Sequence, residues 1–245
     1  MLARILSVGL LAGLVAGLLV AVLQQVTTTP LIVAAEVFET KAADHPAATA
    51  QKAHDHGPHD HGGHEHGGHD EGWKPADGLP RLFYTSLATV VTAVGLALVL
   101  LAAMVVAEEE IDERRALAWA IAGFVAFGLA PAAGLAPELP GSAAADLVAR
   151  QVWWVGTGCA TAIGIWMFFK TEKAVLRVLA LVVLLVPHLI GAPRPHELES
   201  RVPAELAAQF AALSLAVQAS LWVLVGIAIG LLWPRLSRSA AKSVT

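Results

Sequence analysis

Charged residues are scarce in this chain, making up 15% of its 245 residues, whereas hydrophobic residues make up 56%. Soluble proteins average about 25% charged residues. A depletion of this size over such a length excludes an ordinary soluble core and indicates a membrane protein. The net charge of −4 is small. No basic patch interleaved with aromatic residues occurs, so the sequence gives no support to nucleic-acid binding.

Sulfur ligands and catalytic motifs are also lacking. The one cysteine, Cys159, cannot form an internal disulfide or a thiolate metal cage, and its apolar surroundings favour a packing role. Three scattered methionines argue against a thioether route for monovalent copper. The sequence contains no GxxxxGK[S/T] motif and no hydrolase-type serine or cysteine constellation. We therefore expect neither a nucleotide nor an enzyme.

Long apolar runs dominate instead, and a helix needs about 20 such residues to cross a membrane. Six stretches qualify: Leu2–Val26, Leu82–Ala107, Leu117–Gly134, Val152–Phe169, Ala174–Ile190 and Leu206–Trp233. They predict an all-α, polytopic membrane bundle of about six transmembrane helices. Five helices remain an alternative, because Ala174–Ile190 is the shortest run and carries Arg177 in its first turn. With six helices, the chain would consist of a first helix (1–26), an extramembrane loop (27–81), a bundle of about five helices (82–233) and a cytoplasmic tail (234–245).

The first apolar run could instead be a secretory signal peptide, since Arg4 precedes it and Val33-Ala34-Ala35 loosely resembles a cleavage site. The run is longer than the usual signal core, however. Glycines also recur at every fourth position in the first and last runs, at Gly9, Gly13, Gly17, Gly226 and Gly230. This spacing places a flat stripe on one helix face and favours close helix packing in lipid. We interpret the first run as a retained span.

Positive charge decides the orientation, because cytoplasmic loops carry an excess of Lys and Arg close to the helix ends. With six spans, one side holds Arg4, Arg114, Arg115, Lys170, Lys173, Arg177, Arg235, Arg238 and Lys242. The other side holds Lys41, Lys52, Lys74, Arg81, Arg150, Arg194 and Arg201, several of them spread through a long acidic loop. The first set is denser. We expect it to be cytoplasmic, in an inner-membrane protein whose long loop is periplasmic or extracellular.

Histidine is the anomaly of that long loop, since eight of the ten histidines fall between His45 and His69. Imidazole suits divalent cobalt, nickel, copper and zinc, and interleaved carboxylates add oxygen ligands. The predicted metal ligands are His54, His56, His59, His61, His64, His66 and His69 with Asp55, Asp60, Glu65 and Asp70. Repeated glycines and Pro58 oppose a regular helix or strand, so we expect a disordered loop that binds ions in several registers. A solvated spacer without metal is the alternative.

Further ionisable residues cluster where the spans meet the same outer face. The candidate transport path consists of Glu36, Glu39, Glu138, Asp146, Arg150 and His188. Proline-broken span ends beside such groups are plausible walls of an ion vestibule. Each has a simpler interpretation: Glu138 as a loop acid, Asp146 in a first helical turn, Arg150 as an interfacial side chain, His188 as a structural histidine. Within the spans only weak ligands occur: Thr157, Thr161, Ser214 and Gln218.

Several of these segments together resemble the CbtA family of predicted cobalt transporter subunits. The similarity includes Gln24-Gln25, Pro30-Leu31-Ile32, Trp73–Gly78, Leu129-Ala130-Pro131, Pro137–Gly141, Asp146-Leu147, Arg150–Trp154, Pro187-His188 and Gly191-Ala192-Pro193. The resemblance implies cobalt uptake, often linked to cobalamin biosynthesis, beside a small one-span, histidine-bearing CbtB-type subunit. It also implies five spans, as the family is commonly described.

The leading hypothesis is therefore a cobalt, or nickel, uptake subunit in membrane lipid, which collects ions on the outer loop and passes them between helices. Because the spans offer weak ligands, a two-subunit or homo-oligomeric pore is expected. One alternative is a zinc or nickel transporter of another family, although the HxxxxDH signature of nickel–cobalt permeases is absent. The other is a membrane metal sensor or buffer that moves no ion.

Overall fold

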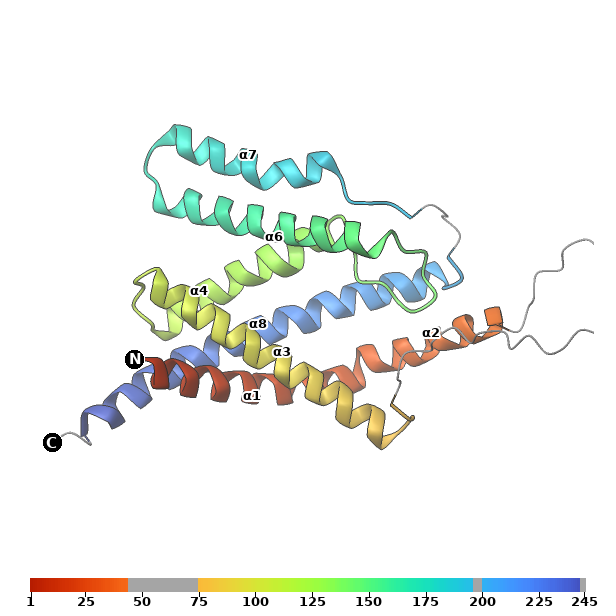
Figure 1. The fold of residues 1–245 in the computed structure, drawn as a ribbon, viewed down its shortest axis with the longest axis horizontal. Helices are drawn as coiled ribbons and strands as arrows, with labels where there is room; N and C mark the ends of the chain where they lie inside the picture. The colour runs from red at the N-terminus through yellow and green to blue at the C-terminus, as the bar shows by residue number, and fades with distance from the viewer. Residues whose placement is uncertain (44–74, 196–199, 243–245) are drawn as a thin grey trace, which may run out of the picture.

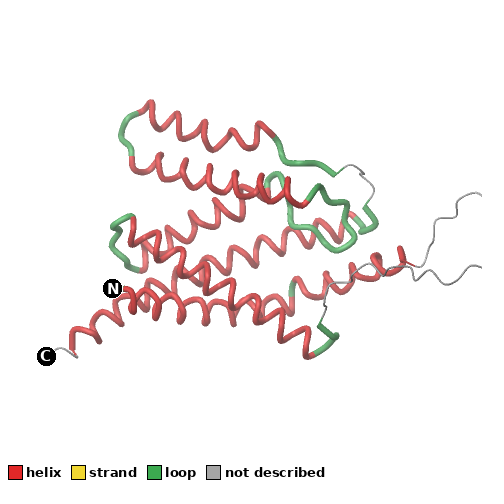
Figure 2. The backbone as a smooth tube through the Cα atoms, viewed as in Figure 1, coloured by secondary structure: helices red, strands yellow, loops and turns green. Residues whose placement is uncertain are grey.

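The computed structural model describes residues 1–43, 75–195 and 200–242, and Figure 1 shows their arrangement. The histidine tract predicted to bind metal lies outside these residues. All regular elements in the described part are helical: α1 (Leu2–Val26), α2 (Thr28–Ala43), α3 (Leu79–Val106), α4 (Glu113–Phe124), the π-helix η1 (Val125–Leu129), α5 (Ala130–Ala132), α6 (Leu147–Lys170), α7 (Ala174–Ile190) and α8 (Ala204–Lys242). Figure 2 shows the same distribution along the backbone.

Five helical segments in this part of the chain are long and apolar enough to span a membrane: Leu2–Val26, Leu79–Val106, Glu113–Ala132, Leu147–Lys170 and Ala204–Leu236. The predicted all-α membrane bundle is confirmed. The fifth predicted stretch forms α7, an apolar helix of 17 residues that is shorter than the others. Helices α1, α3, α4, α6, α7 and α8 alternate in direction, with the short α7 making the return between α6 and α8, so both termini lie at one end of the bundle in Figure 1. The end of α2, the start of α3, the α5–α6 connection, the end of α7 and the start of α8 lie at the opposite end, which we call the outer end.

The glycine stripe of α1 packs against α3, as its spacing predicts. A Cβ on Gly13 would stand 2.6 Å from the backbone nitrogen of Val94, and one on Gly17 would stand 2.7 Å from the Cα of Val90. Such distances leave no room for a side chain, so the two backbones touch. In α8, a Cβ on Gly226 would stand 3.0 Å from the carbonyl oxygen of Ala116 in α4. Close backbone approach is how helices associate in lipid, where the hydrophobic effect between them is weak.

The segment expected to be a loop from residue 27 onward begins as a helix. Thr27 ends α1, its hydroxyl donating to the Leu23 carbonyl at 2.7 Å, and α2 follows at once. Ala35 of α2 is fully buried and packs with Leu139 and Val202. These two residues belong to the α5–α6 and α7–α8 connections. The pattern of polar and apolar residues in the sequence did not predict this helix, because its burial depends on contacts with residues far along the chain.

The third span is interrupted near its outer end by η1. Pro131 has no N–H and its ring would collide with the carbonyl of Phe127 in a regular α-helix. The wider π-turn just before it, closed by a hydrogen bond from the Ala130 N–H to the Val125 carbonyl, accommodates the buried proline. π-turns of this kind frequently occur at functional sites.

Helices α6 and α7 form a hairpin at one edge of the bundle (Figure 1). A Cβ on Gly164 of α6 would stand 2.7 Å from Leu184 of α7, so the two helices pack closely. Ala180 and Pro187 are the buried residues of α7, whereas most of its apolar side chains are exposed. In a membrane, lipid or another subunit would cover them.

Candidate ion-transport site

The candidate path residues with described side chains gather at the outer end, but they do not form one metal site. Across residues 1–38, 75–195 and 200–236, no three His, Cys, Asp or Glu side chains lie close enough together to hold an ion. The side chain of Glu39 and the whole histidine tract lie outside the described part. Each remaining member of the predicted path has a defined neighbour.

Glu138 and Arg150 form an ion pair, with 2.7 Å between Oε2 and Nη2. Glu138 is in the α5–α6 connection and Arg150 is in the first turns of α6. Their side chains remain 28% and 29% exposed, so water reaches both. The neighbouring Leu139 is buried and packs against Ala35 of α2, which fixes this part of the connection. Both charged residues belong to the predicted transport path, but their pairing was not predicted from the sequence.

Asp146 begins α6 as its N-cap. Its carboxylate accepts a hydrogen bond from the Ala149 N–H at 2.9 Å. A carboxylate there satisfies one of the free N–H groups and complements the helix dipole. This geometry agrees with the structural role considered for Asp146 in the sequence analysis.

His188, near the end of α7, lies edge-on to Trp153 of α6, with ring centroids 6.2 Å apart. The imidazole is largely exposed, while the indole of Trp153 packs over Gly134. Within the described part of the chain, the indole N–H of Trp153 is buried without a hydrogen-bond partner, as are the hydroxyls of Thr157 and Thr161 further along α6. Positions 153, 157, 161 and 164 share one helix face, and Gly164 places that face against α7.

Glu36 of α2 pairs with Arg81 of α3, with one Nη1–Oε2 hydrogen bond of 3.0 Å. Arg81 also contacts Asp77 at 3.3 Å. This ion pair links the two ends of the segment that carries the histidine tract, because α2 precedes the tract and α3 follows it.

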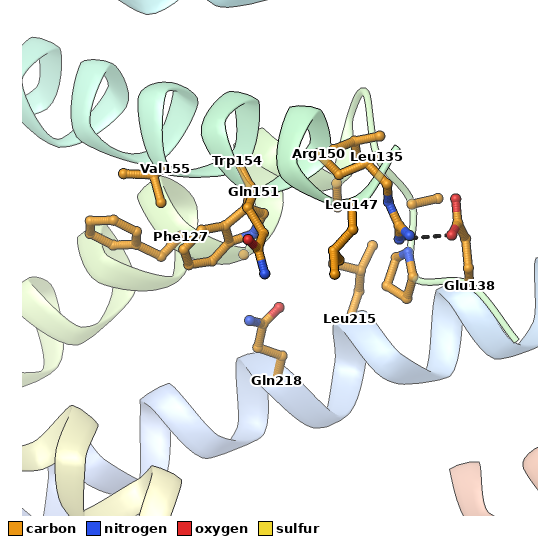
Figure 3. Close-up of a pocket in the computed structure, with 14 residues that line it drawn as sticks. Phe127, Leu135, Glu138, Leu147, Arg150, Gln151, Trp154, Val155, Leu215 and Gln218 are labelled. Carbon is orange, nitrogen blue, oxygen red and sulfur yellow. Dashed lines mark ion pairs between the residues drawn. The ribbon is translucent and has the colours of Figure 1, made fainter. Parts of the chain in front are cut away.

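A cavity of about 650 Å³, the outer cavity, lies beside the Glu138–Arg150 pair. Figure 3 shows the ion pair at one side and Phe127 and Val155 at the other. Two carboxamides, Gln151 of α6 and Gln218 of α8, point toward one another across the space between them. The rest of the wall comes mainly from η1, the α5–α6 connection and the start of α6.

Gln218 also lines a second, smaller cavity of about 350 Å³ between α1, α3 and α8, which we call the side cavity. Its wall includes Gln24, Thr89 and Ser214. The hydroxyl of Thr89 donates to Oε1 of Gln24 at 2.8 Å. Polar side chains of four helices therefore collect at one level near the outer end.

A third cavity of about 750 Å³, the inner cavity, lies toward the end that carries the termini. Its wall is mostly apolar, with Trp119, Trp166 and Trp222 prominent, and Glu109 and Lys170 at its polar edge. Phe127 of η1 lines both the outer and the inner cavity. Its ring lies 5.9 Å from that of Trp154 and packs on Gly158, so it stands between the two spaces.

Glu109 accepts hydrogen bonds from Lys170 at 2.6 Å and Arg115 at 3.2 Å. The hydrogen bond from Lys170 is the main reason that the pKa of Glu109 lies below its ordinary range. Partial burial opposes this shift, and the positive charges of Lys170 and Arg115 support it. Glu110 also pairs with Arg115 at 3.2 Å. Glu109 is thus a largely buried ion-pair partner, whereas Glu110 pairs with Arg115 while remaining exposed to water.

The pair of carboxamides and the role of Phe127 were missed as a site by the sequence analysis. Gln218 was noted as a weak ligand and Gln151 as part of a motif, but they are far apart in the chain. Pro131 was a usable signal, because its clash with the carbonyl four residues earlier places the helix distortion at Phe127.

Comparison with known proteins places the chain in one family. The family model described as "Probable cobalt transporter subunit (CbtA)" matches residues 2–234, nearly the whole chain. Neither a curated protein nor a solved structure matches significantly. The match covers the first four long helices, most of α8, the η1 break and the Glu138–Arg150 connection. This multi-pass membrane protein therefore belongs to the CbtA family of probable cobalt transporter subunits.

Proposed function

We propose that this chain mediates uptake of divalent cobalt, with nickel as a second substrate, across the cytoplasmic membrane. The observation that carries the proposal is the pair of large cavities on either side of Phe127, in a chain of a cobalt transporter family. One cavity opens near the outer end and the other reaches the Glu109–Lys170 pair. A membrane protein that only binds and buffers metal would not need two cavities in series.

The outer end would face the periplasm or the exterior. At the opposite end the described part holds Arg4, Arg114, Arg115, Lys170, Lys173, Arg177 and Arg235 close to helix ends. An excess of Lys and Arg next to the spans favours the cytoplasm. The histidine tract, which connects α2 to α3, would then collect ions outside the cell.

The proposed route begins at the tract and passes the Glu138–Arg150 pair into the outer cavity. Phe127 would be the barrier, because an apolar constriction blocks ions by excluding water. Beyond it lies the inner cavity, whose apolar wall offers a divalent ion few ligands. A second subunit would therefore have to contribute polar groups there. The small, histidine-bearing CbtB-type subunit implied by the family is the preferred candidate, and a second copy of this chain is the alternative.

The test is cobalt uptake by proteoliposomes that contain the full chain, alone and with a CbtB-type partner, measured with radiolabelled cobalt. We expect uptake that saturates, is inhibited by unlabelled cobalt and nickel more than by zinc, and is absent from empty liposomes. Metal binding without uptake in both preparations would favour the sensor or buffer. Preferential inhibition by zinc would favour a transporter of different selectivity.

The collecting role of the tract has a separate test. A peptide covering Ala53–Gly72 should bind cobalt or nickel with micromolar-range affinity in calorimetry at neutral pH, and binding should weaken as the imidazoles protonate near pH 6.5. A matched peptide with every histidine replaced by asparagine is the control. Heat no greater than that of the control peptide would contradict the metal-binding role.

A further inference from the structure

Two uncharged carboxamides face each other across the outer cavity where an ion would enter the membrane. Gln151 is four residues into α6, about 6 Å along the helix axis. Gln218 lies 17 residues before Arg235, or about 25 Å at the same rise, in a membrane whose apolar core measures about 30 Å. If Arg235 marks the inner boundary, both amides lie within about one or two turns of the outer boundary.

The amide of Gln218 packs against the π-helix. A Cβ on Gly128 of η1 would stand 2.8 Å from Oε1 of Gln218, so the amide oxygen lies where a side chain at position 128 would begin. The π-turn thus presents a backbone surface without a side chain to this oxygen. Ser214, one turn earlier in α8, and the Gln24–Thr89 pair add polar atoms on the side-cavity face. The arrangement is a polar layer with no formal charge of its own.

Neutral amides of this number cannot replace the water shell of a dication. Moving even a singly charged ion into a dry, low-dielectric interior is strongly unfavourable, and the cost rises with the square of the charge. The outer cavity has room to avoid this cost. Six waters occupy about 180 Å³ at about 30 Å³ each, well within its volume of about 650 Å³.

We propose that Gln151 and Gln218 bind a hydrated divalent cation through its water shell, rather than by direct coordination. The inference rests on the proposed transport function and names the form in which the ion occupies the outer cavity. Waters bound to a dication are strong hydrogen-bond donors, and the amide oxygens accept from them. The charges at the cavity edge, Glu138 and Arg150, cancel. Such a site releases its ion readily, as conduction requires.

Cobalt(III) hexammine tests this form of binding, because it resembles a hydrated metal ion but does not exchange its ligands. We would measure its binding to the full chain in lipid nanodiscs by equilibrium dialysis. The wild-type protein should bind it, and Gln151→Leu/Gln218→Leu should bind it at least about tenfold more weakly, the loss expected from two ordinary hydrogen bonds. Gln25→Leu is the matched control, since Gln25 lies at the same level but lines none of the three cavities. It should bind as the wild type does.

The histidine tract is the same in all these variants, so any weak binding to its acids cancels in the comparison. Because Gln151 is exposed, Gln151→Leu alone serves if the double variant does not fold. Equal hexammine binding by wild type and the glutamine variants would overturn the proposal. Cobalt uptake is measured in parallel. Hexammine binding without cobalt uptake would contradict the transport function and support the hydrated-ion site. Cobalt uptake that hexammine does not affect would contradict the hydrated-ion site and leave the transport function supported.

Discussion

Replacing Glu138 by glutamine leaves the charge of Arg150 alone at the edge of the outer cavity. The two side chains are 28% and 29% exposed, so water can hydrate the guanidinium and the fold should survive. A sphere of about 650 Å³ has a radius of about 5 Å; at that separation Coulomb's law gives about 1.7 kcal/mol of repulsion between a unit charge and a dication even at the dielectric constant of water. This is somewhat more than tenfold in affinity.

The sign of the effect separates electrostatics from structure. Glu138→Gln should raise the KM for cobalt at least about tenfold, because it leaves a positive charge near the ion. Arg150→Met should lower KM, because it leaves a negative charge. The double variant restores neutrality and should lie near the wild type. The measurement is the initial rate of radiolabelled cobalt uptake into proteoliposomes over a range of concentrations, with thermal unfolding as the control for folding.

If both single variants raise KM alike, the ion pair serves only to hold the α5–α6 connection, and the electrostatic reasoning is wrong. The same conclusion would follow if the double variant were the worst of the three. A rise for Glu138→Gln that did not shrink at high salt would also count against it, since salt screens charges exposed to water.

Three further predictions follow from packing, charge and the cavities. Gly13→Val should destabilise the protein by about 1–3 kcal/mol through overpacking against α3, whereas Gly95→Val, whose Cβ meets open space, should have little effect; thermal unfolding in detergent distinguishes them. Glu109→Gln should destabilise the protein at neutral pH. Folding lowers the pKa of Glu109, so its ionised form stabilises the folded protein above the carboxyl's unfolded pKa. This stabilisation is lost as pH falls through the lower folded pKa. The difference in unfolding midpoint between variant and wild type should therefore shrink in acid. Phe127→Ala should join the outer and inner cavities and raise cobalt leak down a gradient, while Phe83→Ala, an exposed phenylalanine at the start of α3, should not.

The long helices and the contact between α1 and α3 could be predicted because their causes are local. An apolar run of sufficient length has one stable form in lipid, and glycines four residues apart must share a face. Gly13 and Gly17 therefore indicated both the helix and the kind of packing. Only the partner helix had to come from the structure.

The site could not be predicted in the same way, because its groups meet through tertiary packing. Gln151 and Gln218 belong to different helices, and no periodic pattern relates their positions. Asp146 and Glu138 looked equivalent as outer-face acids. One became a helix cap and the other an ion-pair partner, because Asp146 precedes α6 directly while Leu139 ties Glu138 to the buried cluster around Ala35.

The histidine tract and the proposed hydrated-ion site at Gln151 and Gln218 would hold a metal ion with different strengths, and that difference would matter for flux. An ion held with micromolar affinity leaves at roughly 1000 per second if it binds near the diffusion limit of about 10⁹ M⁻¹s⁻¹, whereas nanomolar affinity would slow release to about one per second. Histidines interleaved with acids in a glycine-rich tract are expected to give the weaker kind, since no single rigid site is formed. A hydrated-ion site at Gln151 and Gln218 can accept ions released at that rate without trapping them. Replacing either glutamine by histidine should therefore strengthen cobalt binding and slow uptake together, a combination that a purely structural role for these residues would not produce.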